Sequence, residues 1–265
     1  RYLVEQVGPE HFEQAIRDRC DVDLHDRGQD LTNGYQGDHV GVHNQKQDGL
    51  QYAGFNVIAG RMGGEEFANA ARAAKEYGTD DTSIRLATDQ NFLVTHVPEA
   101  SLGGLMNEPF ARKYRPDPGP FSRGAVGCTG SEFCNYGIIE TKNRVRRWAK
   151  ALYRRIDTPD GLDVVRIHMS GCSASCAQPQ IADVGLRGEV HRDDFESTRA
   201  ADVGLGGDLG DDAFVDWLVG SVPIDEIPSA IRRAVAASAA AGGDGQSFSD
   251  WARETPDAEL RRLFE

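Results

Sequence analysis

The sequence predicts an α+β fold in which a ferredoxin-like unit is followed by an α/β domain. The first supporting observation is the order of the periodic segments, which reads β-α-β-β-α in the first half of the chain. The second is the proline-rich stretch 115–120, which marks a boundary between two regions. The third is the length of 265 residues, which is enough for one large core or two smaller ones.

The first unit combines extended apolar segments with two amphipathic helices. In chain order we expect an apolar strand over 54–59, a helix over 65–77, strands over 83–87 and 92–97, and a helix over 98–107. On the first helix, Phe67, Ala71 and Ala74 fall on one face, which should be buried. Gly78 is a typical helix end.

The second unit begins after the proline-rich stretch. We expect a helix over 141–156, strands over 164–168 and 182–186, and an Ala-rich helix over 224–241 that ends at Gly242-Gly243. The glycine-rich segment 204–210 lacks the spacing of a dinucleotide-binding fingerprint, so we interpret it as a turn or loop.

These patterns divide the chain into three parts. Residues 1–38 are expected to be the tail of a preceding domain and a polar linker, since Phe12, Ala15 and Ile16 form a short amphipathic stripe that needs a partner surface. Residues 39–118 form the ferredoxin-like unit, and residues 119–265 form the second domain.

Two cysteine pairs in glycine-rich surroundings carry the main chemical signal. Cys128 and Cys134 have the spacing C-x5-C, and Cys172 and Cys176 have the spacing C-x3-C. Four thiolates suit a cubane iron–sulfur cluster, because these clusters are held by four cysteines and thiolate is a soft ligand. The sequence therefore predicts a 4Fe-4S site on these four residues.

The spacing also predicts how each pair is presented. Cys172 and Cys176 share one face if their segment is helical. Cys128 and Cys134 would point in opposed directions on a continuous helix, because one turn takes about 3.6 residues. They can converge only if the chain bends between them, and Gly127 and Gly130 allow such a bend.

Other readings of the cysteines remain open. Structural zinc sites usually use tighter spacings, and a disulfide framework is typical of much shorter chains with an even number of cysteines. Four unrelated buried thiols would be the least specific reading. The fifth cysteine, Cys20, is interpreted as a spare thiol.

Composition excludes several classes of function. The chain has 42 acidic and 29 basic residues and a net charge of −13, which argues against a nucleic acid partner. Its apolar runs are all shorter than the roughly 18 residues of a membrane span, and a signal peptide is not visible, so we expect no membrane association. Because thiolate clusters require a reducing compartment, we expect a cytoplasmic location.

The cysteine runs resemble the two cluster motifs of the ferredoxin-dependent nitrite and sulfite reductases. The stretches that carry the resemblance are 125–134 with 138–142 for the first motif, 166–178 with 181–186 for the second, and 39–47, 85–91 and 247–251 for the family's second repeat. The resemblance spans nearly the whole chain but covers only the second of the family's two related halves. We therefore expect the chain to be a C-terminal fragment. In the family, the basic residues that bind the anion substrate lie mainly in the first half, which this chain does not match.

The resemblance implies a second cofactor, sirohaem, and assigns roles to several residues. Cys176 matches the cysteine that bridges the cluster to the sirohaem iron. Gln90 matches a family cofactor contact, and Asn91, Arg85 and Arg123 are further candidates for the sirohaem carboxylates. His43, His96 and His168 are interpreted as structural histidines, because the four thiolates complete the cluster.

Within the family, the sequence favours the nitrite branch. Thr129-Gly130 after the first cysteine and Glu140-Thr141-Lys142 beyond the second are similar to nitrite reductases. Sulfite reduction, or a module that carries only the cluster for electron transfer, remains an alternative. The chain departs from the family at Ser173-Ala174, where Pro-Asn is common, which puts one hydrogen bond near the cofactor in doubt.

The family's electron donor is an acidic ferredoxin, and the chain has one strongly basic segment. This segment, 142–155, is predicted to be a helix that starts close to Cys134. Val145, Trp148, Ala149 and Leu152 form its apolar stripe. A donor could dock on the remaining cations, Arg144, Arg146, Arg147 and Lys150, although a solvated helix face would show the same pattern.

Overall fold

The computed structural model describes residues 2–20, 38–155, 164–192, 197–210, 213–241 and 246–265. It divides into two compact units, Arg1–Tyr35 and Gln36–Glu265. The smaller unit contains α1 (Tyr2–Val7) and α2 (Pro9–Arg17), and none of the nine described residues of α2 is buried. Most of the predicted linker lies outside the described residues.

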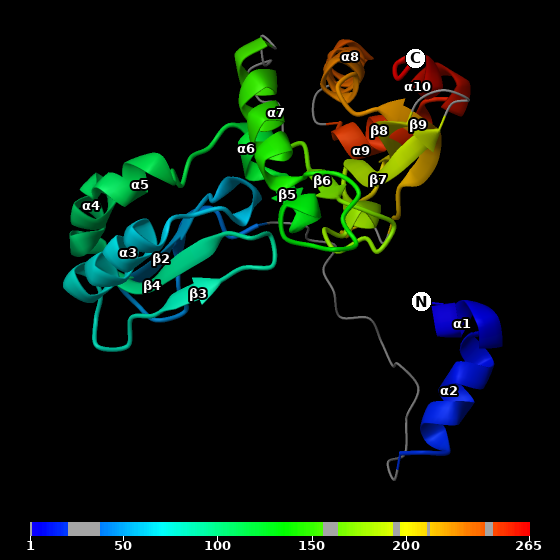
Figure 1. Cartoon of the computed structure of the whole chain (residues 1–265). Helices are drawn as coiled ribbons and strands as arrows, with labels where there is room; N and C mark the ends of the chain where they lie inside the picture. The colour runs from blue at the N-terminus through cyan, green and yellow to red at the C-terminus, as the bar shows by residue number, and fades with distance from the viewer. Residues whose placement is uncertain (1, 21–37, 156–163, 193–196, 211–212, 242–245) are drawn as a thin grey trace. The chain divides into compact units, whose positions relative to one another are not determined.

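The larger unit contains a ferredoxin-like lobe and a cysteine lobe, each with its own sheet and its own apolar core (Figure 1). The ferredoxin-like lobe consists, in chain order, of β1 (Gly41–Asn44), β2 (Leu50–Phe55), η1 (Ile58–Gly60), α3 (Gly64–Tyr77), β3 (Ile84–Leu86), β4 (Phe92–Pro98), α4 (Glu99–Asn107) and α5 (Pro109–Lys113). All strand pairs in it are antiparallel, in the order β1-β2-β4-β3.

The predicted β-α-β-β-α order is present as β2, α3, β3, β4 and α4, so the α+β prediction is confirmed. Strand β1 was not predicted, because its four residues alternate between half-buried and exposed and carry little apolar signal. The predicted buried face was wrong at Phe67, a residue that is 40% exposed and whose ring packs against Phe92. The buried face of α3 consists of Ala70, Ala73 and Ala74.

The cysteine lobe is built around a mixed five-stranded sheet. Its elements are α6 (Pro120–Arg123), β5 (Ala125–Gly127), η2 (Gly130–Glu132), α7 (Lys142–Arg155), β6 (Ile167–Ser170), η3 (Pro179–Ile181), β7 (Val184–Arg192), β8 (Ser197–Leu205), β9 (Asp216–Pro223), α8 (Ile227–Ala241), α9 (Phe248–Glu254) and α10 (Asp257–Arg262). The strand order is β5-β6-β7-β8-β9. Strands β5, β6 and β7 are parallel to one another, whereas β8 is antiparallel to both of its neighbours, β7 and β9.

The predicted helices and strands of this lobe are found with shifted ends, while β8 and β9 extend the sheet beyond the prediction. The apolar stripe of α7 is confirmed, since Val145, Trp148, Ala149 and Leu152 are all buried in the core of the lobe. The predicted end of α8 at Gly242-Gly243 lies outside the described residues.

The glycine-rich segment 204–210 was predicted to be a turn or loop; its first two residues instead complete β8, and the turn begins at Gly206, which has a φ of 84°. Its backbone is held by neighbouring elements: the amides of Gly206 and Gly207 donate to the carbonyls of Asp183 and Ala182. Among the described residues, no helix is both long and apolar enough to cross a membrane.

Candidate metal centre

The two cysteine loops leave the same edge of the sheet. Strands β5 and β6 are parallel neighbours, with Gly127 opposite Met169. Cys128 follows β5 directly, and its amide donates to the Met169 carbonyl at 3.1 Å. Cys172 comes two residues after the end of β6. Because parallel strands end at the same edge, the topology brings both cysteine loops together.

The first loop turns back at Gly130. This residue has a φ of 65°, in the left-handed region that favours glycine, and it starts the short helix η2. The amide of Cys134 then donates to the Gly130 carbonyl at 3.0 Å, which closes the turn. The bend predicted between Cys128 and Cys134 is therefore confirmed at Gly130, whereas Gly127 belongs to β5.

The second loop packs directly on the first. The Cys128 sulfur accepts N–H bonds from Gly130 at 3.3 Å and from Gly171 at 3.1 Å, one from each loop. The Gly171 carbonyl accepts from the amides of Ile138 and Ile139 at 2.8 and 3.2 Å. A Cβ at Gly171 would lie 3.1 Å from the Gly130 Cα, a tight contact, so this approach favours glycine.

The segment from Cys172 to Cys176 is a pair of turns and not a helix, which corrects the helical presentation considered from the sequence. Ser175 has a φ of 60°, which a helix does not allow. The Ala177 amide donates to the Ser170 hydroxyl at 3.0 Å and ties the loop back to β6. Cys176 is exposed, while the other three cysteines of the motifs are half-buried.

This arrangement fits a cluster held by thiolates. All five cysteines are free, and the two N–H donors at Cys128 stabilise negative charge on its sulfur. Among the described residues, no three Cys, His, Asp or Glu side chains converge as a cage for a single metal ion. The residues that would hold a 4Fe-4S cluster are Cys128, Cys134, Cys172 and Cys176.

The run Glu140-Thr141-Lys142 joins the start of α7 to the first loop. The Glu140 carboxylate accepts from the amides of Asn143 and Arg144, which caps the positive end of the helix. The buried Thr141 hydroxyl donates to the Cys128 carbonyl at 2.6 Å. The helix start is thereby fixed against the backbone of the first cysteine.

Lys142 is a site residue that sequence reasoning missed. Its ammonium group donates to the carbonyls of Ala59, at 2.6 Å, and Gly127, at 3.0 Å, so it joins η1 to the end of β5. Burial lowers the pKa of Lys142, and the Arg61 charge lowers it further, while Cys128 opposes the shift. The N-terminus of a helix carries partial positive charge, so a lysine in the first turn is electrostatically unfavourable. A lysine at such a position indicates a specific role, and Lys142 could have been identified on this ground.

Gln90 links the ferredoxin-like lobe to Gly127 of the cysteine lobe. Its side-chain amide donates to the Gly127 carbonyl at 2.8 Å and accepts from the Gly127 amide at 3.2 Å. The buried Asn91 is held within the ferredoxin-like lobe, where it accepts from Asn56 and from the Val57 amide and donates to Asp89. The cofactor contacts expected for both residues stay predictions.

Arg123 and Arg85, the other candidates for sirohaem carboxylates, differ in their surroundings. Arg123 forms a bidentate ion pair with Asp38, at 2.6 and 2.7 Å. Arg85 is exposed on β3, and Ser83 lies 3.4 Å from its Nε. Arg123 lines a hollow of about 180 Å³ with Arg166 and Gln178, and Gln178 follows Cys176 by two residues.

The buried polar groups below the second loop have structural partners. His168 Nδ1 lies 3.1 Å from the Gln178 carbonyl, and burial lowers the pKa of His168 to about 4, so the ring is neutral at pH 7. Burial raises the pKa of Asp183, although the Ser249 hydroxyl and the Arg166 amide both donate to its carboxylate. Asp183 thus connects the start of β7 to α9.

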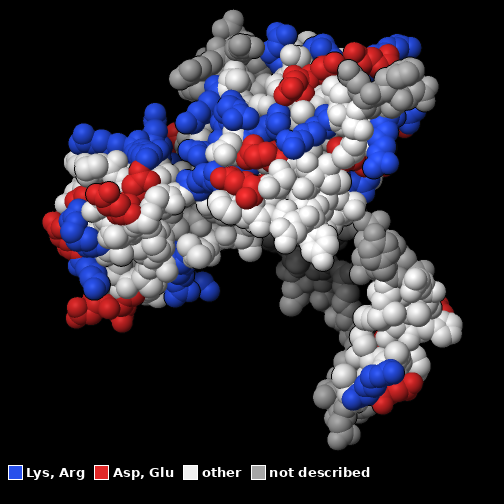
Figure 2. Space-filling view, in the orientation of Figure 1, with Lys and Arg blue, Asp and Glu red and all other residues white. Residues whose placement is uncertain are grey.

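The four cations predicted to dock a donor do not share one environment. Arg144 pairs with Asp225 at 3.0 Å, and only 15% of its side chain is exposed. Arg147 is exposed, whereas Arg146 and Lys150 line a pocket between α7 and the ferredoxin-like lobe. On the face drawn in Figure 2, Lys and Arg side chains gather where Figure 1 places α7.

Fold and site together define a protein with a ferredoxin-like lobe packed against a lobe that presents four cysteines from two converging loops. The family of the nitrite/sulfite reductase ferredoxin-like half domain matches residues 43–111. The chain is 40% identical to an assimilatory ferredoxin-dependent nitrite reductase of Haloferax mediterranei, over 97% of this chain and 46% of the relative. It is 38% identical to a ferredoxin–nitrite reductase of Synechococcus elongatus, over 88% of this chain and 44% of the relative.

The structure is similar to that of the Mycobacterium tuberculosis NirA protein, with a TM-score of 0.84 and 30% identity over 98% of this chain and 48% of that one. Over nearly its whole length the chain is similar to nitrite/sulfite reductases, and it contains their ferredoxin-like half domain, as its sequence predicted. It spans about half the length of the curated relatives it matches.

Proposed function

We propose that the protein carrying this chain is a ferredoxin-dependent nitrite reductase that uses a 4Fe-4S cluster and sirohaem. The observation that carries the proposal is the convergence of the two cysteine loops, with the Cys128 sulfur receiving an N–H bond from each. The relatives named as ferredoxin–nitrite reductases support the nitrite branch. Because a thiolate cluster needs a reducing compartment, we propose a cytoplasmic location.

The reaction requires NO₂⁻ + 8 H⁺ + 6 e⁻ → NH₄⁺ + 2 H₂O, in which nitrogen is reduced and ferredoxin is oxidised. When bound, the two cofactors supply the electron path and an iron that binds the anion. Four thiolates of this chain would hold the cluster, with Cys176 shared with the sirohaem iron. Its exposure leaves that sulfur accessible to a second metal.

The residues around these cysteines would position and tune the centre. Lys142 and Gln90 donate to the Gly127 carbonyl, and Thr141 donates to the carbonyl of Cys128, so hydrogen bonds hold the backbone at the start of the first loop. Arg123 and Arg166, which line the hollow beside the second loop, are the cations we propose for the sirohaem carboxylates.

The proposal is tested on the purified protein that carries this chain. We expect more iron than acid-labile sulfide, because sirohaem adds one iron to the equal numbers of iron and sulfide in the cluster. We also expect a sirohaem absorption spectrum and oxidation of six equivalents of reduced methyl viologen for each ammonium formed from nitrite. A higher kcat/KM for sulfite than for nitrite would instead place the protein in the sulfite branch. Iron and sulfide without sirohaem would indicate a module that carries only the cluster.

We propose that the ferredoxin docks over the cations of α7. The helix starts at Lys142, directly after the first cysteine loop, so a donor bound there is close to the cluster. Arg146, Arg147 and Lys150 make no side-chain hydrogen bond or ion pair within the described part of the chain, so their charges are available to an acidic partner. Arg144 contributes less, because Asp225 already neutralises it.

Replacing Arg146, Arg147 and Lys150 together with glutamate is expected to raise the KM for ferredoxin about tenfold or more, because long-range attraction accelerates encounter. The KM should also become less dependent on salt. Turnover with methyl viologen should not change. A matched control reverses the exposed Arg112, Arg199 and Arg232, which lie on other elements. Equal losses with both donors, or equal effects of the two triple variants, would refute docking on α7.

A further inference from the structure

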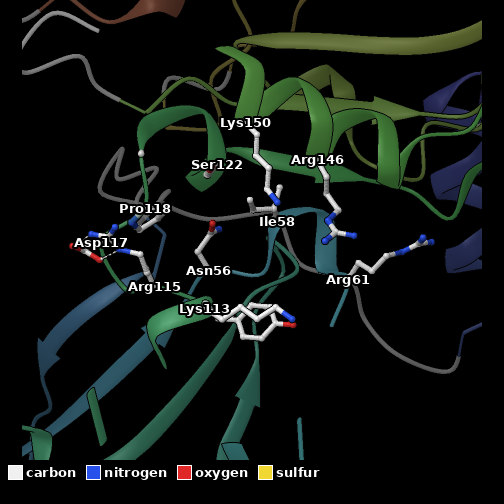
Figure 3. Close-up of a pocket in the computed structure, with 12 residues that line it drawn as sticks. Asn56, Ile58, Arg61, Lys113, Arg115, Asp117, Pro118, Ser122, Arg146 and Lys150 are labelled. Carbon is white, nitrogen blue, oxygen red and sulfur yellow. Dashed lines mark hydrogen bonds and ion pairs between the residues drawn. The ribbon is translucent and has the colours of Figure 1, made fainter. Parts of the chain in front are cut away.

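A cationic pocket lies between the two lobes, away from the cysteines. Its volume is about 250 Å³, and none of its lining residues belongs to the loops that carry Cys128, Cys134, Cys172 or Cys176. One wall comes from the ferredoxin-like lobe and the segment after it, and the opposite wall comes from α7. Figure 3 shows Arg146 and Lys150 projecting from α7 toward Arg61 and Lys113.

The pocket holds an excess of positive charge. Its lining includes five cations, Arg61, Lys113, Arg115, Arg146 and Lys150, and one acid, Asp117. Such a concentration is unexpected in a chain with a net charge of −13, in which acidic residues outnumber basic ones by 42 to 29.

Three of the five cations are already paired. Arg61 contacts Glu132 at 2.5 Å, Arg115 contacts Asp117 at 2.6 Å, and Lys113 forms an ion pair with Glu66. Arg146 and Lys150 have no such partner among the described residues. Two cations without an ion-pair partner among the described residues therefore face the pocket from one helix, opposite the three paired cations.

We propose that this pocket binds a small oxyanion carrying at least two negative charges, such as inorganic phosphate or pyrophosphate. Arginine and lysine are the residues that recognise phosphate oxygens, through forked and point-charge contacts respectively. A monovalent anion could neutralise only one of the two unpaired cations. A multivalent anion can contact Arg146 and Lys150 together and reach the lobe opposite, so its binding would join the two lobes.

The proposal goes beyond nitrite reduction, and its test requires neither reductant nor donor. Pyrophosphate and phosphate are titrated calorimetrically into the oxidised protein, with the ionic strength held constant by sodium chloride. We expect saturable binding and a thermal unfolding midpoint that rises with anion concentration, because a ligand bound to the folded state stabilises it. The double variant Arg146→Ala, Lys150→Ala should weaken binding at least tenfold.

The matched control is Arg112→Ala, Arg147→Ala, which removes the same charge from exposed positions outside the pocket and should bind like the wild type. Lys113→Gln, on the opposite wall, should also weaken binding, so the proposal stays testable if the double variant does not fold. Two results would overturn it: no stabilisation beyond that of chloride at equal ionic strength, or equal losses in the pocket and control variants. Neither result would bear on turnover of nitrite.

Discussion

Replacing Cys176 with serine is expected to abolish nitrite turnover and the spectroscopic coupling between the cluster and sirohaem. A serine hydroxyl is a hard and weakly acidic ligand, and it makes a poor bridge between two irons. The loss should exceed the roughly 10–100-fold decrease that follows removal of an outer-shell partner of a metal site. Because Cys176 is exposed and outside the core, the protein should fold normally.

The measurements for Cys176→Ser are electron paramagnetic resonance of the reduced protein, the absorption spectrum, and turnover with methyl viologen. Cys20→Ser is the control, since Cys20 is an exposed thiol of the smaller unit and should be dispensable. If the Cys176→Ser protein retained a coupled spectrum and full turnover, Cys176 would not be the residue that bridges the cluster and the sirohaem iron.

The bend in the first cysteine loop was predicted from the sequence, whereas the cluster that the four cysteines would hold stays a prediction. Few metal centres suit four thiolates in two close pairs, which is why the sequence favours an iron–sulfur cluster. The bend could be placed because glycine tolerates the left-handed conformation that Gly130 adopts. The buried stripe of α7 was predictable for a similar reason, because helical periodicity and burial are directly linked.

Contacts between residues distant in the sequence could not be predicted in the same way. No local pattern joins Lys142 to Ala59 or Gln90 to Gly127, because these residues are 83 and 37 positions apart. The pocket between the lobes is another product of tertiary packing. From the sequence, Arg146 and Lys150 belong to one solvated helix face, and only the position of the ferredoxin-like lobe distinguishes them from Arg147.

Predictions from local sequence patterns were also wrong where tertiary packing, and not helical periodicity, decides which side chains are buried. Phe67 is the largest apolar residue of α3, yet the buried face consists of alanines. Small side chains let the helix approach the sheet closely, while the Phe67 ring reaches the edge of Phe92 from a half-exposed position. The turn between Cys172 and Cys176 likewise depends on Ser175 adopting a positive φ, which a single sequence does not reveal.

Gly130→Ala is expected to destabilise the protein and to prevent cluster assembly. Alanine at a φ of 65° costs about 1–2 kcal/mol. The added Cβ would also lie 2.6 Å from the Thr141 hydroxyl and 2.9 Å from the Thr141 amide, and overpacking of this kind costs about 1–3 kcal/mol. The free energy of unfolding should therefore fall by about 2–5 kcal/mol in a urea titration.

The effect on the metal site should exceed the effect on the fold, because Thr141 holds the Cys128 carbonyl and Gly130 donates to the Cys128 sulfur. Iron and labile sulfide contents should drop to a small fraction of the wild-type values. Gly127→Ala is the matched control, since its Cβ would meet Ala59 and Lys142 at 3.5 Å, an ordinary contact distance, with the backbone in a strand. If the two alanine variants lost stability and iron equally, the left-handed turn at Gly130 would not be what brings the first two cysteines together.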